Sequence, residues 1–518
     1  MTPPLVSVVI PTYNGQRYLV DAVQSVLDQS YPHLEIIVVD DRSPSGIAPS
    51  LSGIADSRLR VLVHTVNQGA VAARWTVVRA ASGEIIAFLD DDDMFHPDKL
   101  KAHVEYLERR PDVGVTFNGR FEVDAGTGFI RSIWQPPDAV TLADLVLGFP
   151  FSPSDTVVRR RWALQDDIWD QSYVSRDGEI IFNGGEIVFG GRLAFAGASF
   201  GNVGRALTYR RYHPRRVFGG LSRRCRSERD CQALILDDPR CPEAVRGLRD
   251  EAFRNTYTIW AYYGFAQDET TLGQAFVREA VRLDPTLLDG RPSALVEFMV
   301  GQVAGDSSVD LEEEVARIFA QWPSELSAPA HELELAVANG YLAKGAQAVL
   351  FGRTAEGREW LARAAAQGAT TSDRFIQQLT HHLLGSQREF GDQVVDQAID
   401  TLEPLLDRIG LNAGRRVRAS FAMNRALSQY KAGDYRSVPG RVGTAIANDP
   451  RFLFNRGALA ILVRSLAGGG TRWSSASSVA VVDDPAALRI DGKRHLAQSP
   501  ARHRPSHGTL RVGLHEEQ

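Results

Sequence analysis

Four consecutive aspartates, Asp90 to Asp93, directly follow the apolar run Glu84–Leu89. A short apolar run is typical of a strand buried in an α/β sheet, and open α/β sheets bind ligands at the carboxyl ends of their strands. Clustered carboxylates repel one another unless a cation lies among them, and hard divalent cations prefer carboxylate and phosphate oxygens. The cluster therefore predicts a site for a metal-bridged nucleotide phosphate. The alternative is an acidic turn at the start of a helix, because residues 93–97 look like a loop that enters one.

The spacing of the four aspartates predicts two different environments. On an extended segment Asp90 and Asp92 point one way, toward metal and phosphate, while Asp91 and Asp93 point the other way. A second acidic pair, Asp40-Asp41, ends the preceding strand pattern. Because a carboxylate accepts hydrogen bonds from a ribose hydroxyl or a base N–H, Asp41 is a candidate for nucleoside recognition. The alternative is that Asp41 caps the Ser43-Pro44 turn.

The segment Pro11-Thr12-Tyr13-Asn14-Gly15 follows the first strand pattern and would line the same crevice. Tyr13 offers an aromatic ring to a base. A simple turn explains Asn14-Gly15 equally well.

The elements that position these residues alternate between short apolar strands and amphipathic helices. This alternation indicates βαβ units and a mostly parallel sheet over about the first 117 residues. The predicted strands are 6–10, 35–40, 60–64, 84–89 and 113–117, and the predicted helices are 18–28, 69–81 and one that begins at His96-Pro97.

The ordered series of these segments resembles the family 2 glycosyltransferases of GT-A fold. The resemblance rests on residues 6–14, 35–41, Asn67-Gln68-Gly69 with Arg74, and 83–93; it is strong over residues 5–120 and weak over 120–215. It implies an enzyme of the hexosyl-transferring type that moves a sugar from a nucleotide donor, UDP-sugar favoured, to an acceptor hydroxyl with inversion at the anomeric carbon.

The resemblance also implies a role for individual residues. Nucleotide binding is expected of Pro11, Tyr13, Asp41, Arg74, Asp90 and Asp91, and a divalent cation, Mg or Mn, is expected to bind Asp92 and Asp90. Trp75 stands where the family commonly has asparagine after the arginine, and this departure would reshape the pocket without removing the charge.

Inversion requires a general base that takes the proton of the acceptor hydroxyl. The family places this carboxylate six residues before the arginine of an Arg-Leu-Ala helix, which corresponds to Glu186 before Arg192. Asp177 and Glu179 are substitutes, because the usual second acid is absent, and the glycines around Glu186 weaken the expected helix. The alternative for Glu186 is a surface glutamate.

The segment Tyr209–His213 matches a family segment that borders the donor. His213 is expected to reach the metal or a phosphate, against the alternative of an ordinary surface or core histidine. The arginine-rich stretch that continues to Arg224 would form a lid over the pyrophosphate. Its alternatives are a site for a lipid phosphate or an anionic membrane, and a solvated basic face.

At 518 residues the chain exceeds one hydrophobic core. We expect a GT-A domain over 1–222, a linker over 223–250, an all-α domain over 251–467 and a disordered tail over 468–518. The helix ends Asp284-Pro285 and Asp449-Pro450 look alike, and residues 424–435 resemble a tetratricopeptide-type helix and turn. An irregular helical bundle explains the same pattern.

Composition gives further bounds. Hydrophobic residues make up 44% and charged residues 23%, and a net charge of -5 gives no reason to expect nucleic acid. No apolar run is long enough to span a membrane and the chain starts without a signal-peptide pattern. We therefore expect a cytoplasmic protein, with a peripheral position at the inner face of the membrane as the alternative.

The sequence therefore predicts a metal-dependent, inverting glycosyltransferase of polysaccharide or glycoconjugate biosynthesis. Its acceptor would be a glycan, a lipid-linked sugar or a protein, and its helical half would bind the acceptor, a partner protein or another subunit. The alternative is a non-catalytic sugar-nucleotide-binding interaction protein. A nucleotidyltransferase is disfavoured, because Pro11-Thr12-Tyr13-Asn14 is not a glycine- and lysine-containing phosphate loop.

Overall fold

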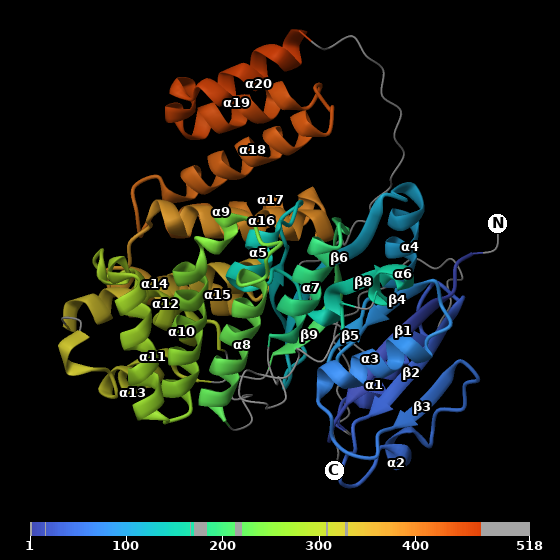
Figure 1. The fold of residues 1–518 in the computed structure, drawn as a ribbon. Coiled ribbons are helices and arrows are strands. Elements are labelled where there is room, and N and C mark those ends of the chain that lie inside the picture. Colours follow the sequence, from blue (N-terminus) through green and yellow to red (C-terminus); the bar gives the residue numbers. More distant parts are fainter. Residues whose placement is uncertain are drawn as a thin grey trace. The chain divides into compact units, whose positions relative to one another are not determined.

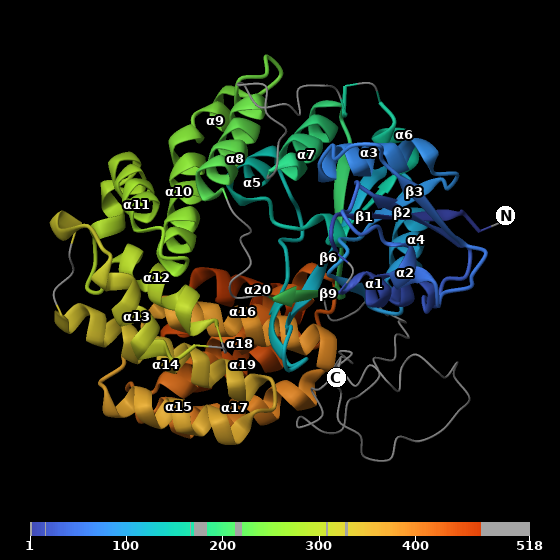
Figure 2. The ribbon, with the colours of Figure 1, turned by 90° about the horizontal axis from the view of Figure 1, so that it is seen from below.

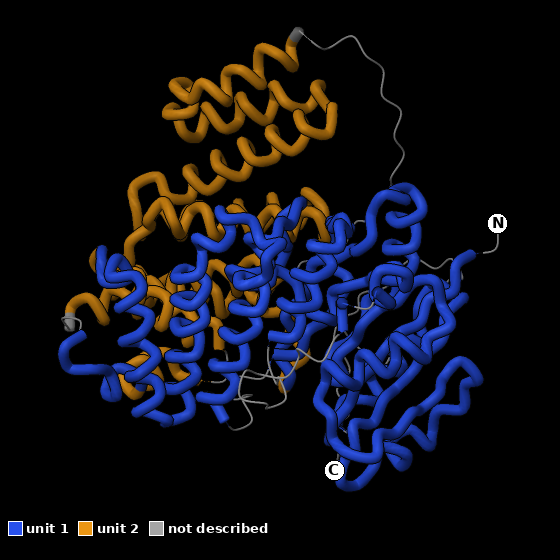
Figure 3. Tube along the Cα trace, in the orientation of Figure 1, with its two compact units in different colours: residues 1–125, 134–289, 318–326 blue, residues 126–133, 290–317, 327–518 orange. Residues whose placement is uncertain are grey.

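The computed structural model describes residues 3–15, 17–165, 167–169, 184–212, 220–306, 309–326 and 330–467. The chain forms two compact units. The first spans residues 1–125, 134–289 and 318–326, and the second spans the remaining described residues (Figure 3). The predicted tail over 468–518 lies outside the described residues.

Four parallel strands begin the sheet of the first unit. They are β1 (Val6–Thr12), β2 (Leu34–Asp40), β3 (Leu59–Val63) and β4 (Ile85–Phe88), in the order β3-β2-β1-β4 (Figure 1). Thr12 pairs with Asp40, and Val9 pairs with Phe88, so the carboxyl ends of β1, β2 and β4 meet at one edge. This edge confirms the predicted convergence of the acidic strand ends.

The sheet continues with antiparallel and mixed pairing. After β4 come β8 (Thr156–Arg159), β6 (Val113–Asp124), β9 (Ser199–Tyr212) and β5 (Met94–Phe95), and β7 is Ile130–Trp134. The prediction of a loop at Met94-Phe95 is wrong, because these residues pair with Tyr209 and Thr208 of β9. A strand of two residues is too short to produce a periodic pattern, and its partner lies more than 100 positions away.

Two hydrophobic cores lie on opposite faces of the parallel strands, because alternate strand residues point to opposite sides. Val8 and Ile10 pack with α1 (Leu19–Leu27) and α4 (Lys99–Arg109), whereas Val9 packs with α3 (Ala70–Ala80) and α7 (Gly185–Phe195). Figure 2 shows α3 on one side of β1 and β2, and α1 and α4 on the other. The shorter helices are α2 (Ala48–Leu51), α5 (Leu142–Gly148) and α6 (Arg160–Ala163).

The first unit extends beyond the predicted domain. It includes α8 (Leu221–Leu236), α9 (Glu243–Arg246), α10 (Arg249–Ala266) and α11 (Thr270–Leu283). The predicted boundary at residue 222 and the linker over 223–250 differ from this division, because α8 packs against α7 through Cys231 and Ile235. The composition of α8 did not indicate this apolar face, because the helix is rich in arginine.

Helices follow to residue 467, as predicted. They are α12 (Ala294–Ala304), α13 (Leu311–Ala320), α14 (Ala330–Leu350), α15 (Thr354–Ala366), α16 (Asp373–Phe390), α17 (Asp392–Leu406), α18 (Ala413–Lys431), α19 (Val438–Asn448) and α20 (Arg456–Ala467). A tetratricopeptide-like repeat stays a prediction. In the part of the chain that the structure describes, no helix is both long and apolar enough to cross a membrane.

The two similar helix ends share one local structure. After α11, Asp284 accepts a hydrogen bond from the Thr286 backbone N–H at the start of a 3₁₀ helix. After α19, Asp449 accepts one from the Arg451 N–H in the same way. The aspartate caps the short helix and the proline, which has no N–H to satisfy, begins it.

Candidate functional site

The aspartate cluster forms a turn at the carboxyl end of β4. The Asp93 backbone N–H donates to the Asp90 carbonyl oxygen at 3.1 Å, so the extended alternation predicted for Asp90 to Asp93 does not hold. Asp90, Asp91 and Asp92 are half-buried, whereas Asp93 is buried. The turn therefore presents three carboxylates near solvent and turns the fourth into the protein.

The segment after β1 packs directly on this turn. The Thr12 hydroxyl donates to Asp91 Oδ2 at 2.5 Å. A Cβ atom on Gly15 would lie 1.7 Å from the same oxygen, so only glycine fits this close approach. Asn14 has a positive φ of 58°, and its N–H donates to the Ser43 hydroxyl. The predicted turn and the predicted position beside the aspartates are therefore both present.

Tyr13 stands at the same edge with 53% of its surface exposed, while Pro11 is buried in β1. An exposed aromatic ring next to the carboxylates is available to stack on a planar ligand. The nucleoside contacts assigned to Pro11 and Tyr13 stay predictions.

Asp41 is buried and fully engaged within the protein. Its Oδ1 accepts from the Gln68 N–H at 2.9 Å and lies 2.7 Å from His64 Nδ1, and its Oδ2 accepts from the Gly69 N–H at 2.7 Å. Gly69 begins α3, so Asp41 fixes the start of the helix that carries Arg74. The alternative role of capping Ser43 belongs to Asp40, whose Oδ1 accepts from the Ser43 N–H. Nucleoside recognition by Asp41 stays a prediction.

Arg74 forms an ion pair with the aspartate turn. Its Nη2 lies 2.5 Å from Asp90 Oδ1, with 14% of the Arg74 side chain and 31% of the Asp90 side chain exposed. The Nε of Arg74 is buried without a hydrogen-bond partner among the described residues. A buried donor without a partner is costly, so this guanidinium retains capacity to bind an anion.

Glu186 lies in the first turn of α7, which confirms the predicted helix. Its glycines are explained by close packing, since a Cβ on Gly190 would lie 2.8 Å from the Phe149 ring and one on Gly191 2.6 Å from Ile235 Cδ1. From the sequence alone, these glycines indicated only a weakened helix.

Arg74 and Glu186 line one pocket. The free space of the pocket, with the solvent at its mouth, is about 370 Å³. Its remaining wall is mostly apolar and includes Phe88, Phe149, Trp169 and Phe189. Two charged groups that are 112 positions apart in the sequence therefore face the same small volume.

Burial raises the pKa of the Glu186 carboxyl above its ordinary value. The positive charge of Arg74 lowers this pKa and the negative charge of Asp90 raises it further, so the three groups share one electrostatic environment. A carboxylate with a raised pKa is a stronger base than an ordinary glutamate.

Trp75 supports the pocket wall from behind. Its ring stacks on Trp169 with centroids 5.7 Å apart, and the Trp169 Nε1–H donates to the Ala163 carbonyl oxygen at 2.6 Å. Trp75 thus contacts a residue of the pocket wall, and the reshaping of the pocket by this departure from the family pattern stays a prediction.

Arg211 on β9 holds the aspartate turn from the protein side, and the sequence reading missed it. Its Nη1–H donates to the Asp92 carbonyl oxygen at 2.9 Å, and its Nη2 lies 2.6 Å from Asp21 Oδ2 on α1. Its guanidinium also covers the Tyr18 ring at 4.6 Å. Of the other predicted residues, His213, Asp177 and Glu179 lie outside the described residues.

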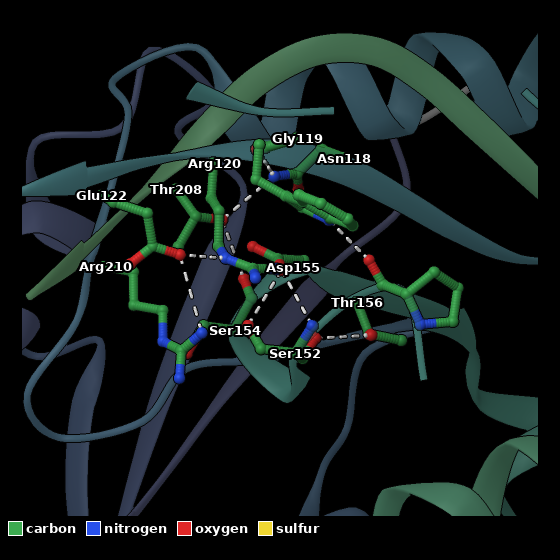
Figure 4. Close-up of polar contacts among 12 residues, drawn as sticks. Asn118, Gly119, Arg120, Glu122, Ser152, Ser154, Asp155, Thr156, Thr208 and Arg210 are labelled. Atoms are coloured by element: carbon green, nitrogen blue, oxygen red, sulfur yellow. Dashed lines mark hydrogen bonds and ion pairs between the residues drawn. The ribbon is translucent and has the colours of Figure 1, made fainter. Parts of the chain in front are cut away.

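A buried polar network supports the same turn. The Ser154 hydroxyl accepts from the Asp90 N–H at 3.0 Å, and the Ser154 carbonyl oxygen accepts from Lys99 Nζ at 2.8 Å. Lys99 Nζ also donates to Asn118, which in turn donates to Thr208. In Figure 4, Arg120 lies between Glu122 and Asp155, with which it forms ion pairs.

Burial lowers the pKa of Lys99 to about 7, although the charges of Asp155 and Asp93 oppose this shift. Burial and the charge of Asp90 raise the pKa of Asp93. This polar network was not predicted from the sequence, although the sequence contains an indication of it. Lys99 and His103 lie on the inward face of α4 with Leu100, Val104 and Leu107. Polar residues on an apolar helix face indicate a buried network.

Among the described residues, no three His, Cys, Asp or Glu side chains are arranged to hold a metal ion by themselves. The half-buried carboxylates of Asp90 and Asp92 are hard oxygen donors. Such a set fits Mg or Mn, because these ions are commonly held by one or two carboxylates and completed by substrate phosphates and water.

Comparisons with known proteins find similarity in the N-terminal region. Residues 7–165 match the model of Glycosyl transferase family 2. The putative teichuronic acid biosynthesis glycosyltransferase TuaG of Bacillus subtilis is 44% identical over 109 residues, which are 21% of this chain and 43% of that protein. The Escherichia coli UDP-Glc:alpha-D-GlcNAc-diphosphoundecaprenol beta-1,3-glucosyltransferase WfgD is 36% identical over 103 residues, which are 20% of this chain and 41% of that protein.

Among solved structures, S. aureus TarS 1-349 in complex with UDP-GlcNAc matches with a TM-score of 0.41 and 17% identity, covering 60% of this chain and 90% of that chain. The chain spans less than half the length of the curated relatives it matches. Residues 7–165 are therefore similar to Glycosyl transferase family 2, and this region contributes to a mixed α/β sheet.

Proposed function

We propose that this chain is a metal-dependent, inverting glycosyltransferase that transfers a sugar from a nucleotide-sugar donor, UDP-sugar favoured, to an acceptor hydroxyl. One observation carries the proposal: in a chain whose residues 7–165 are similar to family 2, the ion-paired Arg74 and the carboxylate Glu186 line one pocket beside the aspartate turn. A cation and a base in one small volume suit the departure of a diphosphate and the activation of a hydroxyl.

The donor would lie along the carboxyl edge of β1, β2 and β4. Tyr13 is exposed there to stack on the base, and Pro11 and Asp41 shape the nucleoside pocket. The Arg74 guanidinium, whose side chain is 14% exposed, would place its positive charge near the diphosphate, beside Asp90 and Asp91. Mg or Mn, held by Asp92, Asp90 and His213, would neutralise the charge of the departing diphosphate.

Glu186 would act as the general base. Its carboxylate takes the proton of the acceptor hydroxyl while the hydroxyl oxygen bonds to the anomeric carbon, and the bond from that carbon to the diphosphate oxygen breaks with inversion. The raised pKa of Glu186 strengthens it as a base, and the positive charge of Arg74 opposes this rise and favours the ionised carboxylate. The apolar wall around Trp169 limits water beside the reacting groups.

The proposed acceptor is a sugar of a growing glycan, a lipid-linked sugar or a protein, in polysaccharide or glycoconjugate biosynthesis. This choice rests on the names of the two relatives, one a teichuronic acid biosynthesis enzyme and the other acting on a diphosphoundecaprenol-linked sugar. We propose that the helical region binds the acceptor or a partner protein.

The test is a screen of the full chain against UDP-, GDP- and dTDP-sugars with Mn or Mg. It measures donor binding by calorimetry and release of the nucleoside diphosphate. Asp92→Ala should abolish metal-dependent binding. Glu186→Gln should keep donor binding but lower transfer by about 100-fold or more. Glu243→Gln is the matched control, because Glu243 is an exposed glutamate in the first turn of α9.

The outcomes separate the alternatives. Absence of metal-dependent donor binding and turnover in every combination would refute the proposal. Donor binding without turnover under any condition would instead favour a sugar-nucleotide-binding interaction protein. Equal losses in Glu186→Gln and Glu243→Gln would remove the role of base from Glu186.

A further inference from the structure

The outer face of α20 is exposed and apolar. This helix packs through Ala458 and Ile461 on α18 and α19, which run beside it in Figure 1. Its outward side chains recur at intervals of four and three residues and are joined by two apolar residues just before the helix. These five residues form what we call the α20 surface: Leu453, Phe454, Leu459, Val463 and Leu466.

The exposure is large for side chains of this kind. Phe454 is 86% exposed, Leu466 65% and Val463 64%. Isolated exposed apolar residues are ordinary, but a cluster on one helix face indicates an interaction site. The five side chains carry no hydrogen-bonding groups, so their partner must offer apolar contact.

The sequence around this face carries more positive than negative charge, although Arg441 and Arg451 are ion-paired with Asp392 and Asp449. Residues 435–467 contain five arginines and no lysine, with Asp449 as the one acidic residue, although the whole chain has a net charge of -5. Asp449 is already ion-paired with Arg451. Arg456 and Arg464 are exposed on α20 itself. The partner should therefore offer both apolar groups and negative charge.

We propose that the α20 surface docks on an anionic lipid membrane, with α20 lying in the plane of the interface. Helices that combine exposed Phe, Leu and Val with arginine bind in this way, the apolar side chains entering the acyl boundary and the arginines contacting anionic headgroups. At 12 residues α20 reaches about 18 Å, too short to span the hydrocarbon core. Docking in the plane is thus the geometry that its length permits.

Two other occupants fit the charge less well. A second copy of the chain, related by two-fold symmetry, would bring Arg456 and Arg464 of both copies together, and like charges repel. Residues 468–518 carry seven Lys and Arg against five Asp and Glu, so this segment is also basic. A membrane containing anionic lipid complements the face without such repulsion.

The test is flotation of the full chain with vesicles of phosphatidylcholine alone and with about 30% phosphatidylglycerol. We expect binding only to the anionic vesicles. Phe454→Glu and Val463→Glu should each lower the partition coefficient by about tenfold or more, because each removes a buried apolar contact and adds a negative charge. The double variant Arg456→Gln/Arg464→Gln should lower it about fivefold for each arginine removed.

Leu411→Glu is the matched control. Leu411 is 88% exposed, lies in the loop between α17 and α18 and is outside the α20 surface, so its substitution should leave vesicle binding unchanged. Circular dichroism and thermal unfolding of each variant check that the fold is retained. The assay needs neither donor nor metal, so its result is independent of the proposed transferase activity.

Three results would overturn the proposal. The first is no binding to anionic vesicles, and the second is an equal loss of binding in Leu411→Glu and Val463→Glu. The third is a dimer in light scattering that Val463→Glu dissociates while vesicle binding is absent, which would assign the α20 surface to a second copy of the chain.

Discussion

Arg211 is predicted to determine both the stability of the first unit and the position of the aspartate turn. Its side chain has no exposed surface, pairs with Asp21 of α1 and donates to the Asp92 carbonyl oxygen. It thus joins β9, α1 and the aspartate turn through one guanidinium. Arg211→Met keeps much of the side-chain volume against the Tyr18 ring and removes these polar contacts.

The expected loss follows from the burial of the two partners. Removing one partner of a buried ion pair costs about 3–5 kcal/mol. The Asp21 side chain keeps 19% exposure, so water reaches its charge in part and the lower end, about 3 kcal/mol, applies. The lost hydrogen bond to Asp92 adds about 1 kcal/mol. We expect the free energy of unfolding to fall by about 4 kcal/mol in total.

The assay is urea denaturation of the full chain and of Arg211→Met, Asp21→Asn and the double variant. The pair predicts a clear coupling energy, so the double variant should lose less stability than the sum of the two single variants. On the proposed function, transfer by Arg211→Met should fall by on the order of 100-fold, because a displacement of about 1 Å in a site has this effect. Arg211→Lys, which keeps the charge but not both contacts, should fall between the wild type and Arg211→Met.

Arg210→Met is the control on the same strand. The Arg210 side chain is 48% exposed and lies 3.6 Å from Glu122, which keeps a shorter ion pair with Arg120, so we expect a loss below about 1 kcal/mol. The reasoning is refuted if Arg211→Met costs no more than Arg210→Met, or if the Arg211 and Asp21 substitutions are additive.

Three further predictions concern the pocket and its support. The transfer rate should rise with pH until Glu186 is deprotonated, at a pH above the range of an ordinary glutamate. Arg74→Ala should move this rise to higher pH, because a neighbouring positive charge is lost. An unchanged pH profile in Arg74→Ala contradicts this prediction. Trp75→Asn should lower the free energy of unfolding by about 1 kcal/mol through the lost stacking on Trp169. It should also raise the KM for the acceptor and leave the metal dependence unchanged. An unchanged KM contradicts the role of Trp75 in the pocket wall. Burial lowers the pKa of Lys99 to about 7 in the folded chain, against an ordinary value of 10.5. Between these two pH values Lys99 binds fewer protons in the folded chain than in the unfolded chain. The free energy of unfolding therefore rises with pH through this window, and Lys99 gives no such pH dependence below it. The stability of Lys99→Met relative to the wild type should therefore fall between pH 7 and about pH 9 in urea denaturation, and a constant difference contradicts the lowered pKa.

Local pattern was sufficient to predict the parallel half of the sheet and the place of the candidate site. The strands β1, β2 and β4 read as mostly apolar runs because both of their faces are buried, whereas the edge strand β3 is largely exposed and was predicted from its alternation with the helices. The helical region was equally readable from its period. The two-residue strand β5 and the packing of α8 were not predicted, because each depends on a partner far away in the sequence.

The sequence by itself determined which chemical groups are present and at which strand ends they stand, because strand periodicity and the order of the motifs are local properties. Only the tertiary structure decided what each group contacts. It engages Asp41 with the start of α3, buries Asp93, sets Arg74 and Glu186 on one pocket wall and joins Arg211 to Asp21, 190 positions apart. Such contacts arise when distant segments pack side by side, and a contact between single side chains leaves no periodic trace in either segment.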